Sequence, residues 1–331
     1  MYLCKLRQEL PSPGPPPSPF MIPAFFTTDD GDIVLRAGSE PNSKHDFRVH
    51  KVILSFASPV FRDMLAFPQP LDQALDEEHQ LPIVDIPEAP EVFDTILRFI
   101  YPVVEQPKIA KPSTLATLLF TADKYNISSV YPVLGERLKK FLPPTSDPLW
   151  VYIMACRFGL SDVAKEAAKV SSSSSFSYLN NREDIRHVSS TDLYRLFQFV
   201  QTRERNGLIT IWAILHPLFL EESAKCSHKE EDAKGYYFRL QKAVKQTFLY
   251  DPCVGAKGLS AVLDKVPDPP RGCDPLPRSA EYLFGGGEYD HFNCPLRPMT
   301  LRKRLYEIAD CLNSLNDVLL DKFFGKDFGS G

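Results

Sequence analysis

The sequence predicts an α+β protein, with a small sheet covered by helices and then a mostly α-helical C-terminal region. Three observations support this class. Short alternating strand patterns occur only before Val92. From Val92 onward, apolar residues recur at the three- and four-residue spacing that is typical of helices. The chain has 331 residues, which is enough for two domains.

The N-terminal residues 1–24 contain a proline-rich tract, PSPGPPPSP, at residues 11–19. Such a tract favours the extended polyproline conformation and forms neither helix nor sheet. We therefore predict a disordered lead-in. The tract is typical of a spacer, and it also fits a ligand of SH3- or WW-type domains.

Three strands are predicted in the first block. A turn signal at Asp30-Gly31 is followed by a first strand, which begins with Ile33 to Leu35. After a polar loop at 38–44, the alternating residues 47–50 predict a second strand that runs back along the first. These two runs predict a hairpin with a long loop. Residues 81–86 predict a third, buried strand, after a proline-rich and acidic loop.

Helices should cover one face of this sheet, because a sheet this small needs helices over its apolar side. Residues 51–56 predict a short helix, and Pro59 can begin the next one, since its missing N–H would be unpaired there anyway. Apolar periodicity predicts three more helices, in the segments 92–100, 115–122 and 130–141. We therefore predict one α+β domain over residues 25–145.

Residues 146–331 predict a helical region of one domain or two. Amphipathic or apolar segments lie at 149–160, 191–200, 208–220 and 236–249, and a serine run at 171–175 interrupts them. Residues 251–298 are rich in proline, glycine and cysteine and predict an irregular segment. The last helix has heptad-like spacing, which fits either a coiled coil or a helix packed on its own domain, at Leu301, Leu305, Ile308, Leu312, Leu315 and Leu319.

Four sequence blocks, in order, resemble the BTB/POZ domain: DGDIVLR, FRVHKVILSFASPVFRDML, LPIVDIPEAPEVFDTILRFIYP and TLATLLFTADKYNISSVYPVLGERLKKFL. The resemblance is greatest to the BTB-domain proteins of basidiomycete fungi and covers about residues 27–145. It continues through PLWVYIMACRFGLSDVAKEAAK, which is similar to the helical extension of those proteins.

The resemblance implies roles for individual residues. In the family, the matching positions serve fold and assembly, so it implies that His50 is a structural corner residue with a hydrogen-bonded ring nitrogen, not a catalytic base. The matching positions are Asp32, His50, Lys51, Leu54, Ser58, Phe61, Met64, Phe99, Tyr101, Ala122 and Tyr125.

The resemblance also implies function. BTB domains are protein-interaction modules, and many form homodimers, so we expect a non-enzymatic scaffold with protein partners. The candidate interface residues, some of which should be core instead, are Val52, Ile53, Phe56, Val60, Phe61 and Leu65. The alternatives are a substrate adaptor of a cullin-type ubiquitin ligase and a transcription-linked factor. Known cullin binders often carry a hydrophobic-x-Glu motif, and residues 67–73 lack its glutamate.

Motifs of catalytic chemistry are not found. The sequence has no glycine-rich phosphate loop, no G-x-S-x-G and no H-E-x-x-H, so we predict no catalytic residue and no cofactor. Wide spacings and the lack of a C-x₂₋₄-C pair argue against zinc at the one candidate set, Cys226, His228, Cys253, Cys273 and Cys294. Cys156 and Cys311 lie beside apolar helical stripes, so we predict that both are core residues. A hydrolase using the C-terminal cysteines remains an alternative.

Composition and charge indicate which kinds of partner and which cellular location to expect. The net charge of −4 and a pI near 6.0 argue against nucleic-acid binding by the whole chain. The basic run at 302–304 fits the solvated face of a helix or a nuclear localisation signal. We expect no membrane span, because the longest apolar run, 208–220, is too short. With no secretory signal, reduced cysteines predict a cytoplasmic or nuclear protein.

Overall fold

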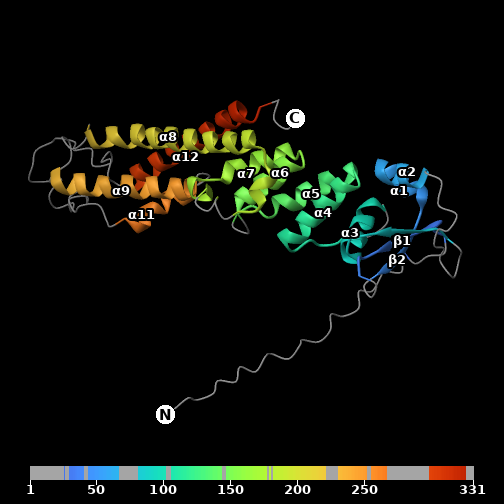
Figure 1. The fold of residues 1–331 in the computed structure, drawn as a ribbon. Helices are drawn as coiled ribbons and strands as arrows, with labels where there is room; N and C mark the ends of the chain where they lie inside the picture. The colour runs from blue at the N-terminus through green and yellow to red at the C-terminus, as the bar shows by residue number, and fades with distance from the viewer. Residues whose placement is uncertain are drawn as a thin grey trace, which may run out of the picture. The chain divides into compact units, whose positions relative to one another are not determined.

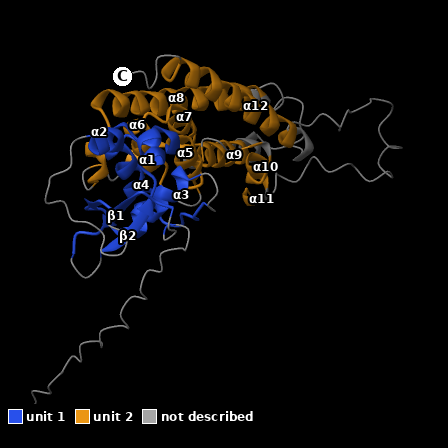
Figure 2. Cartoon of the chain, turned by 90° about the vertical axis from the view of Figure 1, so that its right-hand side faces the viewer, with its two compact units in different colours: residues 1–130 blue, residues 131–331 orange. Residues whose placement is uncertain are grey.

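The computed structural model describes residues 26, 30–40, 44–66, 81–101, 106–143, 147–176, 179, 182–220, 230–251, 255–266 and 298–325. It divides into two compact units, unit 1 (Met1–Val130) and unit 2 (Tyr131–Gly331), which are coloured separately in Figure 2. The predicted N-terminal lead-in, residues 1–24, and the loop at 67–80 lie outside the described residues.

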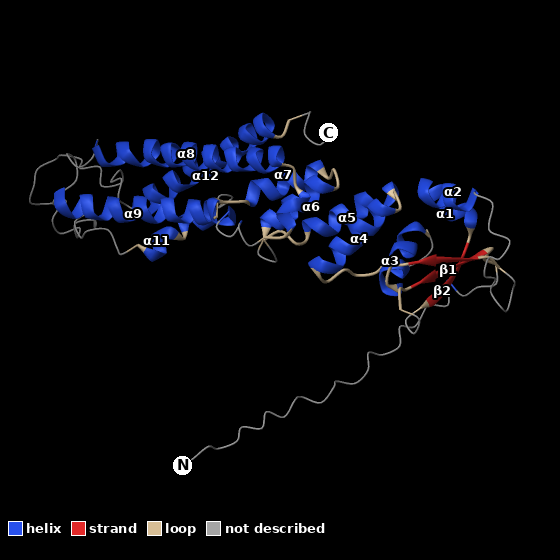
Figure 3. Cartoon of the chain, in the orientation of Figure 1, coloured by secondary structure: helices blue, strands red, loops and turns tan. Residues whose placement is uncertain are grey.

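The sheet of unit 1 has three strands in the described part of the chain, β1 (Ile33–Ala37), β2 (His45–Val49) and β3 (Ile83–Ile86), drawn as red arrows in Figure 3. Their order is β2-β1-β3. β1 pairs antiparallel with β2, with Ile33 opposite Val49, and parallel with β3, with Val34 opposite Ile83. The predicted hairpin and third strand are confirmed.

Four α-helices of unit 1 are described: α1 (Lys51–Ala57), α2 (Pro59–Ala66), α3 (Pro90–Ile100) and α4 (Pro112–Lys124) (Figure 1). The 3₁₀ turn η3 (Ser128–Val130) follows them. Three of the helices begin with proline, at a position where its missing N–H removes no hydrogen bond. The α+β class is confirmed, and the chain continues into a helical C-terminal region.

Aromatic rings join the helices of unit 1. Phe61 of α2 stacks on Tyr125, which follows α4, with ring centroids 4.8 Å apart. Phe93 of α3 meets both rings edge-on, at 6.2 Å and 6.0 Å. Such pairs contribute about 0.5–1.5 kcal/mol each beyond the burial of their area. The three elements therefore share one aromatic core.

Unit 2 is helical in its described part (Figure 1). It begins with α5 (Tyr131–Lys139), α6 (Pro148–Arg157) and α7 (Ser161–Val170), followed by the 3₁₀ turns η4 (Ser173–Phe176) and η6 (Asp184–His187). Its long helices are α8 (Ser190–Leu220), α9 (Glu230–Tyr250) and α12 (Pro298–Phe323). They pack with one another around a buried apolar cluster that includes Ile211, Leu240, Val244, Leu305 and Ile308.

Helix α8 joins two predicted segments, 191–200 and 208–220, into one helix of 31 residues. The residue between them with the lowest helix propensity is Gly207, and packing explains its presence. A Cβ atom there would lie 2.3 Å from the ring of Phe248 on α9. Glycine therefore permits the close approach of α8 and α9 without ending the helix.

The prediction that residues 251–298 are irregular is wrong at its start. Two short helices lie there, α10 (Ala256–Ser260) and α11 (Val262–Lys265). Leu259, Val262 and Val266 are buried in the core of unit 2, and this apolar spacing stabilises the turns despite the surrounding glycines and prolines. Residues 267–297 lie outside the described part of the chain, and Pro298 begins α12.

The leucine stripe of α12 packs inside unit 2. Leu301, Leu305, Ile308, Leu312 and Leu319 are buried, and α12 lies against α8 and α10. Of the two open alternatives, the helix packed on its own domain accounts for this burial. Cys311 is exposed on the same helix, so its prediction as a core residue is wrong, while Cys156 on α6 is only partly exposed.

Candidate protein-interaction site

The corner between β2 and α1 is built around His50. Its backbone is extended, with φ −109° and ψ 122°, and its N–H donates to the Tyr101 hydroxyl at 2.9 Å. The ring Nδ1 lies 3.1 Å from the same hydroxyl, and Nε2 lies 3.5 Å from a carboxylate oxygen of Asp30. The hydroxyl accepts from the backbone, so it can donate to Nδ1 and leave the Nε2 proton facing Asp30.

Asp32 supplies the first acceptor of α1. The N–H of Lys51, at the start of the helix, donates to Asp32 Oδ1 at 2.7 Å. Amides in a first helical turn have no partner within the helix, and a side chain at the N-cap usually accepts from one of them. The His50 side chain makes no such bond, and Asp32, the residue before β1, accepts instead.

These contacts support the structural role predicted for the corner. Burial raises the pKa of the Tyr101 hydroxyl to about 12, so it stays a neutral hydrogen-bonding group. The Asp30 side chain is 71% exposed. A carboxylate therefore does face the imidazole, but from solvent, and the hydroxyl on the other side of the ring is engaged in holding the corner together.

A buried serine joins the two helices that follow. The Ser58 N–H donates to the Leu54 carbonyl and so closes α1, and its Oγ accepts from the Phe61 N–H, 3.0 Å away, and so opens α2. The same hydroxyl donates to the Tyr125 carbonyl at the end of α4. One fully buried side chain therefore fixes the joint between α1 and α2 and holds it against the end of α4.

Tyr125 is held in turn by Glu88, which precedes α3. Its hydroxyl donates to Glu88 Oε2 at 2.5 Å, and Lys124 pairs with the other carboxylate oxygen. Burial and this carboxylate raise the pKa of Tyr125. Sequence reasoning missed Glu88, because a lone glutamate 37 residues away carries no spacing signal.

The remaining predicted motif positions lie as follows. Asp32 is exposed, and Lys51, Met64 and Phe99 are intermediate in exposure. The others are buried, namely Leu54, Ser58, Phe61, Tyr101, Ala122 and Tyr125.

The outer face of α1 is apolar. Val52 and Phe56 stand four residues apart, on the same face of the helix, and are 72% and 95% exposed. Ile53, Val60 and Leu65 are partly buried. Phe61, which was also predicted as an interface residue, is fully buried in the aromatic core, so the available surface is the other five residues.

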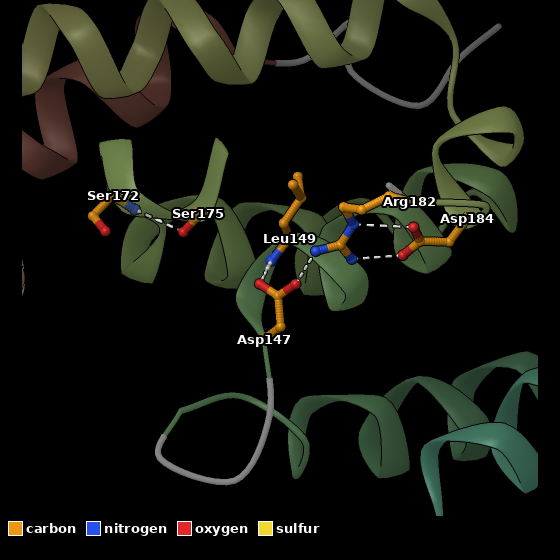
Figure 4. A network of polar contacts seen from close by, with 6 residues as sticks. All are labelled: Asp147, Leu149, Ser172, Ser175, Arg182 and Asp184. Atoms are coloured by element: carbon orange, nitrogen blue, oxygen red, sulfur yellow. Dashed lines mark hydrogen bonds and ion pairs between the residues drawn. The ribbon is translucent and has the colours of Figure 1, made fainter. Parts of the chain in front are cut away.

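A polar network in unit 2 is a second candidate site (Figure 4). Asp147 caps α6 by accepting from the Leu149 N–H at 3.0 Å, and the Arg182 guanidinium donates to both Asp147 and Asp184. The two carboxylates raise the pKa of Arg182. Because the cation and both anions are matched, this network fastens η6 to the start of α6 and leaves no group for a ligand.

The described residues of unit 2 bear on metal and thiol chemistry only through the side chains named next. No group of three or more metal-ligating side chains occurs among the described residues. The candidate zinc set, Cys226, His228, Cys253, Cys273 and Cys294, lies outside them. Burial raises the pKa of the Cys156 thiol to about 12, the opposite of nucleophile activation. Within the described part of the chain, no helix has the length and apolar character to span a bilayer.

Comparison with known proteins agrees with this geometry. Residues 26–142 match the family model of the BTB/POZ domain. TD and POZ domain-containing protein 5 of Mus musculus is 34% identical over 94 residues, which are 28% of this chain and 26% of that protein. The chain thus matches about a quarter of the length of this curated relative. The predicted BTB/POZ domain is confirmed, and the likeness to basidiomycete members stays a prediction.

Proposed function

We propose that this chain, whose residues 26–142 form a BTB/POZ domain, is a scaffold that self-associates through the exposed face of α1. BTB/POZ domains are protein-interaction modules and often dimerise. The observation that carries the proposal is the 95% exposure of Phe56 beside the exposed Val52. Burying a side chain of this size contributes about 1.5–3 kcal/mol.

The geometry of α1 supports a binding role. The Asp32 carboxylate fixes its first turn and Ser58 fixes its end, so the helix is ordered before a partner arrives. A preorganised surface loses less entropy on association, and more of its apolar burial then appears as affinity. The proposed mechanism is therefore burial of apolar area and involves no chemical step.

The size of the surface sets an expectation. An obligate dimer buries on the order of 2,000 Å² or more, which is beyond what Val52 and Phe56 can supply. The partly buried Ile53, Val60 and Leu65 lie on α1 and α2 and would extend the contact. We therefore expect both helices to contribute to the interface.

Light scattering after size exclusion tests this proposal on the full chain. We expect a dimer at twice the monomer mass of 37.5 kDa, and a monomer when Val52→Asp and Phe56→Asp are combined. Phe238→Asp is the matched control, since Phe238 is also an exposed aromatic, 66% accessible, but belongs to unit 2. A monomeric wild type, or a double variant that remains fully dimeric, contradicts the proposal.

The same measurement addresses the cullin alternative. A cullin N-terminal domain is added to the wild-type chain, and the mass of the mixture is recorded. Because residues 67–73 lack the glutamate of known cullin binders, we expect no larger complex. A complex that forms and is lost in the double variant would identify an adaptor and overturn the scaffold as the main role.

The proposal includes a cytoplasmic or nuclear location. It is supported by Cys156 and Cys311, which are free thiols, as expected in a reducing compartment. Imaging of the tagged full chain in cells tests it, and a secreted or lumenal signal would contradict it.

A further inference from the structure

Helix α9 has a buried stripe that fixes which of its sides faces outward. Tyr236, Leu240, Val244 and Phe248 follow one another at every fourth position, and all are buried in the core of unit 2. The helix lies alongside α8, where the Phe248 ring packs against Gly207 (Figure 1). Successive residues of a helix are about 100° apart, so the side opposite this stripe faces away from the core.

The outward side of α9 combines apolar and basic side chains. Phe238 is 66% exposed and Leu249 is 38% exposed, and about 16 Å of helix separates them. Lys242 and Gln246 are exposed between the two, and Arg239 is exposed beside Phe238. These five residues are the outer face of α9, which is apolar at both ends and basic in the middle.

The charges on this part of α9 are all positive. Residues 235–249 include Arg239, Lys242 and Lys245 but neither aspartate nor glutamate, although the net charge of the whole chain is −4. Within the described ranges, none of these three cations forms an ion pair. The helix is therefore locally basic in an acidic protein.

The other long helices of unit 2 show what an ordinary solvated face looks like. Such a face usually carries charges of both signs that pair with one another. On α8, Arg195 pairs with Asp192 at 2.9 Å, and on α12, Arg304 pairs with Glu307 at 2.7 Å. The outer face of α9 has no acid of its own, so its cations keep their attraction for an anion from another molecule.

We infer that the outer face of α9 binds an acidic, helical segment of a partner protein. The partner needs apolar side chains about 16 Å apart to cover Phe238 and Leu249, and carboxylates between them to meet Arg239 and Lys242. Positions i, i+4, i+7 and i+11 lie on one side of a helix, so a segment of about three turns supplies both kinds of group. Complementary charge then selects the partner, and the two apolar contacts add affinity.

A protein partner fits this face better than an anionic membrane does. Helices that bind a membrane surface insert a continuous apolar face into the lipid. The continuous apolar stripe of α9 lies inside unit 2, so only Phe238 and Leu249 remain available. The whole chain is also acidic, and anionic lipids repel an acidic protein.

Fluorescence anisotropy of a designed peptide tests the inference on the full chain. The probe is a labelled, alanine-rich helix of about 20 residues, with leucine at positions i and i+11 and glutamate at i+4 and i+7. The control peptide has the same composition, with the glutamates on the opposite side of the helix. We expect the probe to bind at least about tenfold more tightly than the control, and to bind less tightly as salt screens the charges.

The contribution of the α1 contact is separated by a second chain. A chain that carries Val52→Asp and Phe56→Asp should bind the probe as the wild type does. The result for α9 therefore does not depend on whether the chain self-associates through α1.

A charge reversal tests the face itself. Lys242→Glu should raise the dissociation constant of the probe at least about tenfold, because it replaces an attraction by a repulsion. The same variant should bind a peptide in which lysines replace the glutamates, and the wild type should not. Phe238→Ser should weaken binding of the probe about fivefold, because the apolar contact is lost.

Lys140→Glu is the matched control for these variants. Lys140 is also an exposed lysine of unit 2, but it follows α5 and is not part of α9. This variant changes the net charge as Lys242→Glu does, and it should leave the dissociation constant of the probe unchanged. Circular dichroism of each variant establishes that the helices remain folded.

Three outcomes would overturn the inference. The first is a probe that binds the wild-type chain no better than the control peptide. Another is a Lys242→Glu variant that binds the probe as tightly as Lys140→Glu does. The last is binding to vesicles of phosphatidylcholine and phosphatidylserine that Lys242→Glu abolishes while the probe does not bind, which would assign the face to a membrane.

Discussion

The Phe61 ring lies almost parallel to the Tyr125 ring, with centroids 4.8 Å apart and 2° between their planes. The pair connects α2 to the residue that ends α4, and both side chains lie in the core of unit 1. The stacked pair and the buried Ser58 thus both join α2, which follows the exposed helix α1, to the end of α4.

Phe61→Ala should destabilise unit 1 by about 3–5 kcal/mol, because it removes a fully buried ring and leaves a cavity. Chemical denaturation followed by circular dichroism measures the loss. Phe56→Ala deletes the same ring at a 95% exposed position, and it should change the stability of the monomer by less than about 0.5 kcal/mol. Equal losses in the two variants would refute the assignment of Phe61 to the core.

Asp32→Ala should cost about 0.5–2 kcal/mol, because the Lys51 N–H loses its acceptor at the start of α1. Asp32→Asn keeps a side-chain oxygen and should retain most of that stability. The free energy of unfolding measured for both variants separates the hydrogen bond from the charge. An asparagine variant as unstable as the alanine variant would show that the charge, not the cap, is what matters.

Tyr101 should make unit 1 sensitive to alkaline pH. Burial raises its pKa from 10.0 to about 12, so the hydroxyl is protonated in both states below pH 10, and its full contribution is present there. Above pH 10 the unfolded chain loses the proton first, and stability falls until the pH passes about 12.

The loss at Tyr101 should be on the order of 2–3 kcal/mol across that window. Tyr101→Phe should be less stable at neutral pH, since the His50 N–H loses its acceptor, but its stability should fall less from pH 10 to 12. Unfolding free energies of both chains at several pH values measure this difference. Parallel pH profiles would exclude Tyr101 as the titrating group.

Gly207→Ala should destabilise unit 2 by about 1–3 kcal/mol, because the new methyl group would meet the Phe248 ring. Phe248→Leu in the same chain should recover part of the loss, and a double-mutant cycle measures the coupling. Gly235→Ala on α9 is the control. Its methyl group would meet only the far end of Arg239, at 3.5 Å, so it should stabilise the helix by about 0.5–1 kcal/mol.

Local patterns predicted most of the regular structure. The hairpin and the helices of unit 1 were predictable because strand alternation and helical spacing are local, and prolines mark three of the helix starts. The continuity of α8 was not, since Gly207 lowers helix propensity, and only the approach of Phe248, 41 residues away, explains it. The short helices at 256–265 were hidden by the glycines and prolines around them.

The site was harder to predict than the fold. The motif positions and the apolar run of α1 were recognisable, but apolar character alone does not separate core from surface. Phe56 and Phe61 look alike in sequence, and one is 95% exposed while the other is fully buried. The acceptor of the Lys51 N–H was equally hard to predict, because Asp32 lies 19 residues away, before the first strand.

The buried hydroxyl of Ser58 has a consequence for synthesis of the chain. Its acceptor is the carbonyl of Tyr125, 67 residues further along, so the joint between α1 and α2 is incomplete until that residue has left the ribosome. Contacts between such distant residues form late and slow folding. A nascent chain or a fragment that ends before Tyr125 would lack the ring that stacks on Phe61, and the exposed apolar surface would favour aggregation.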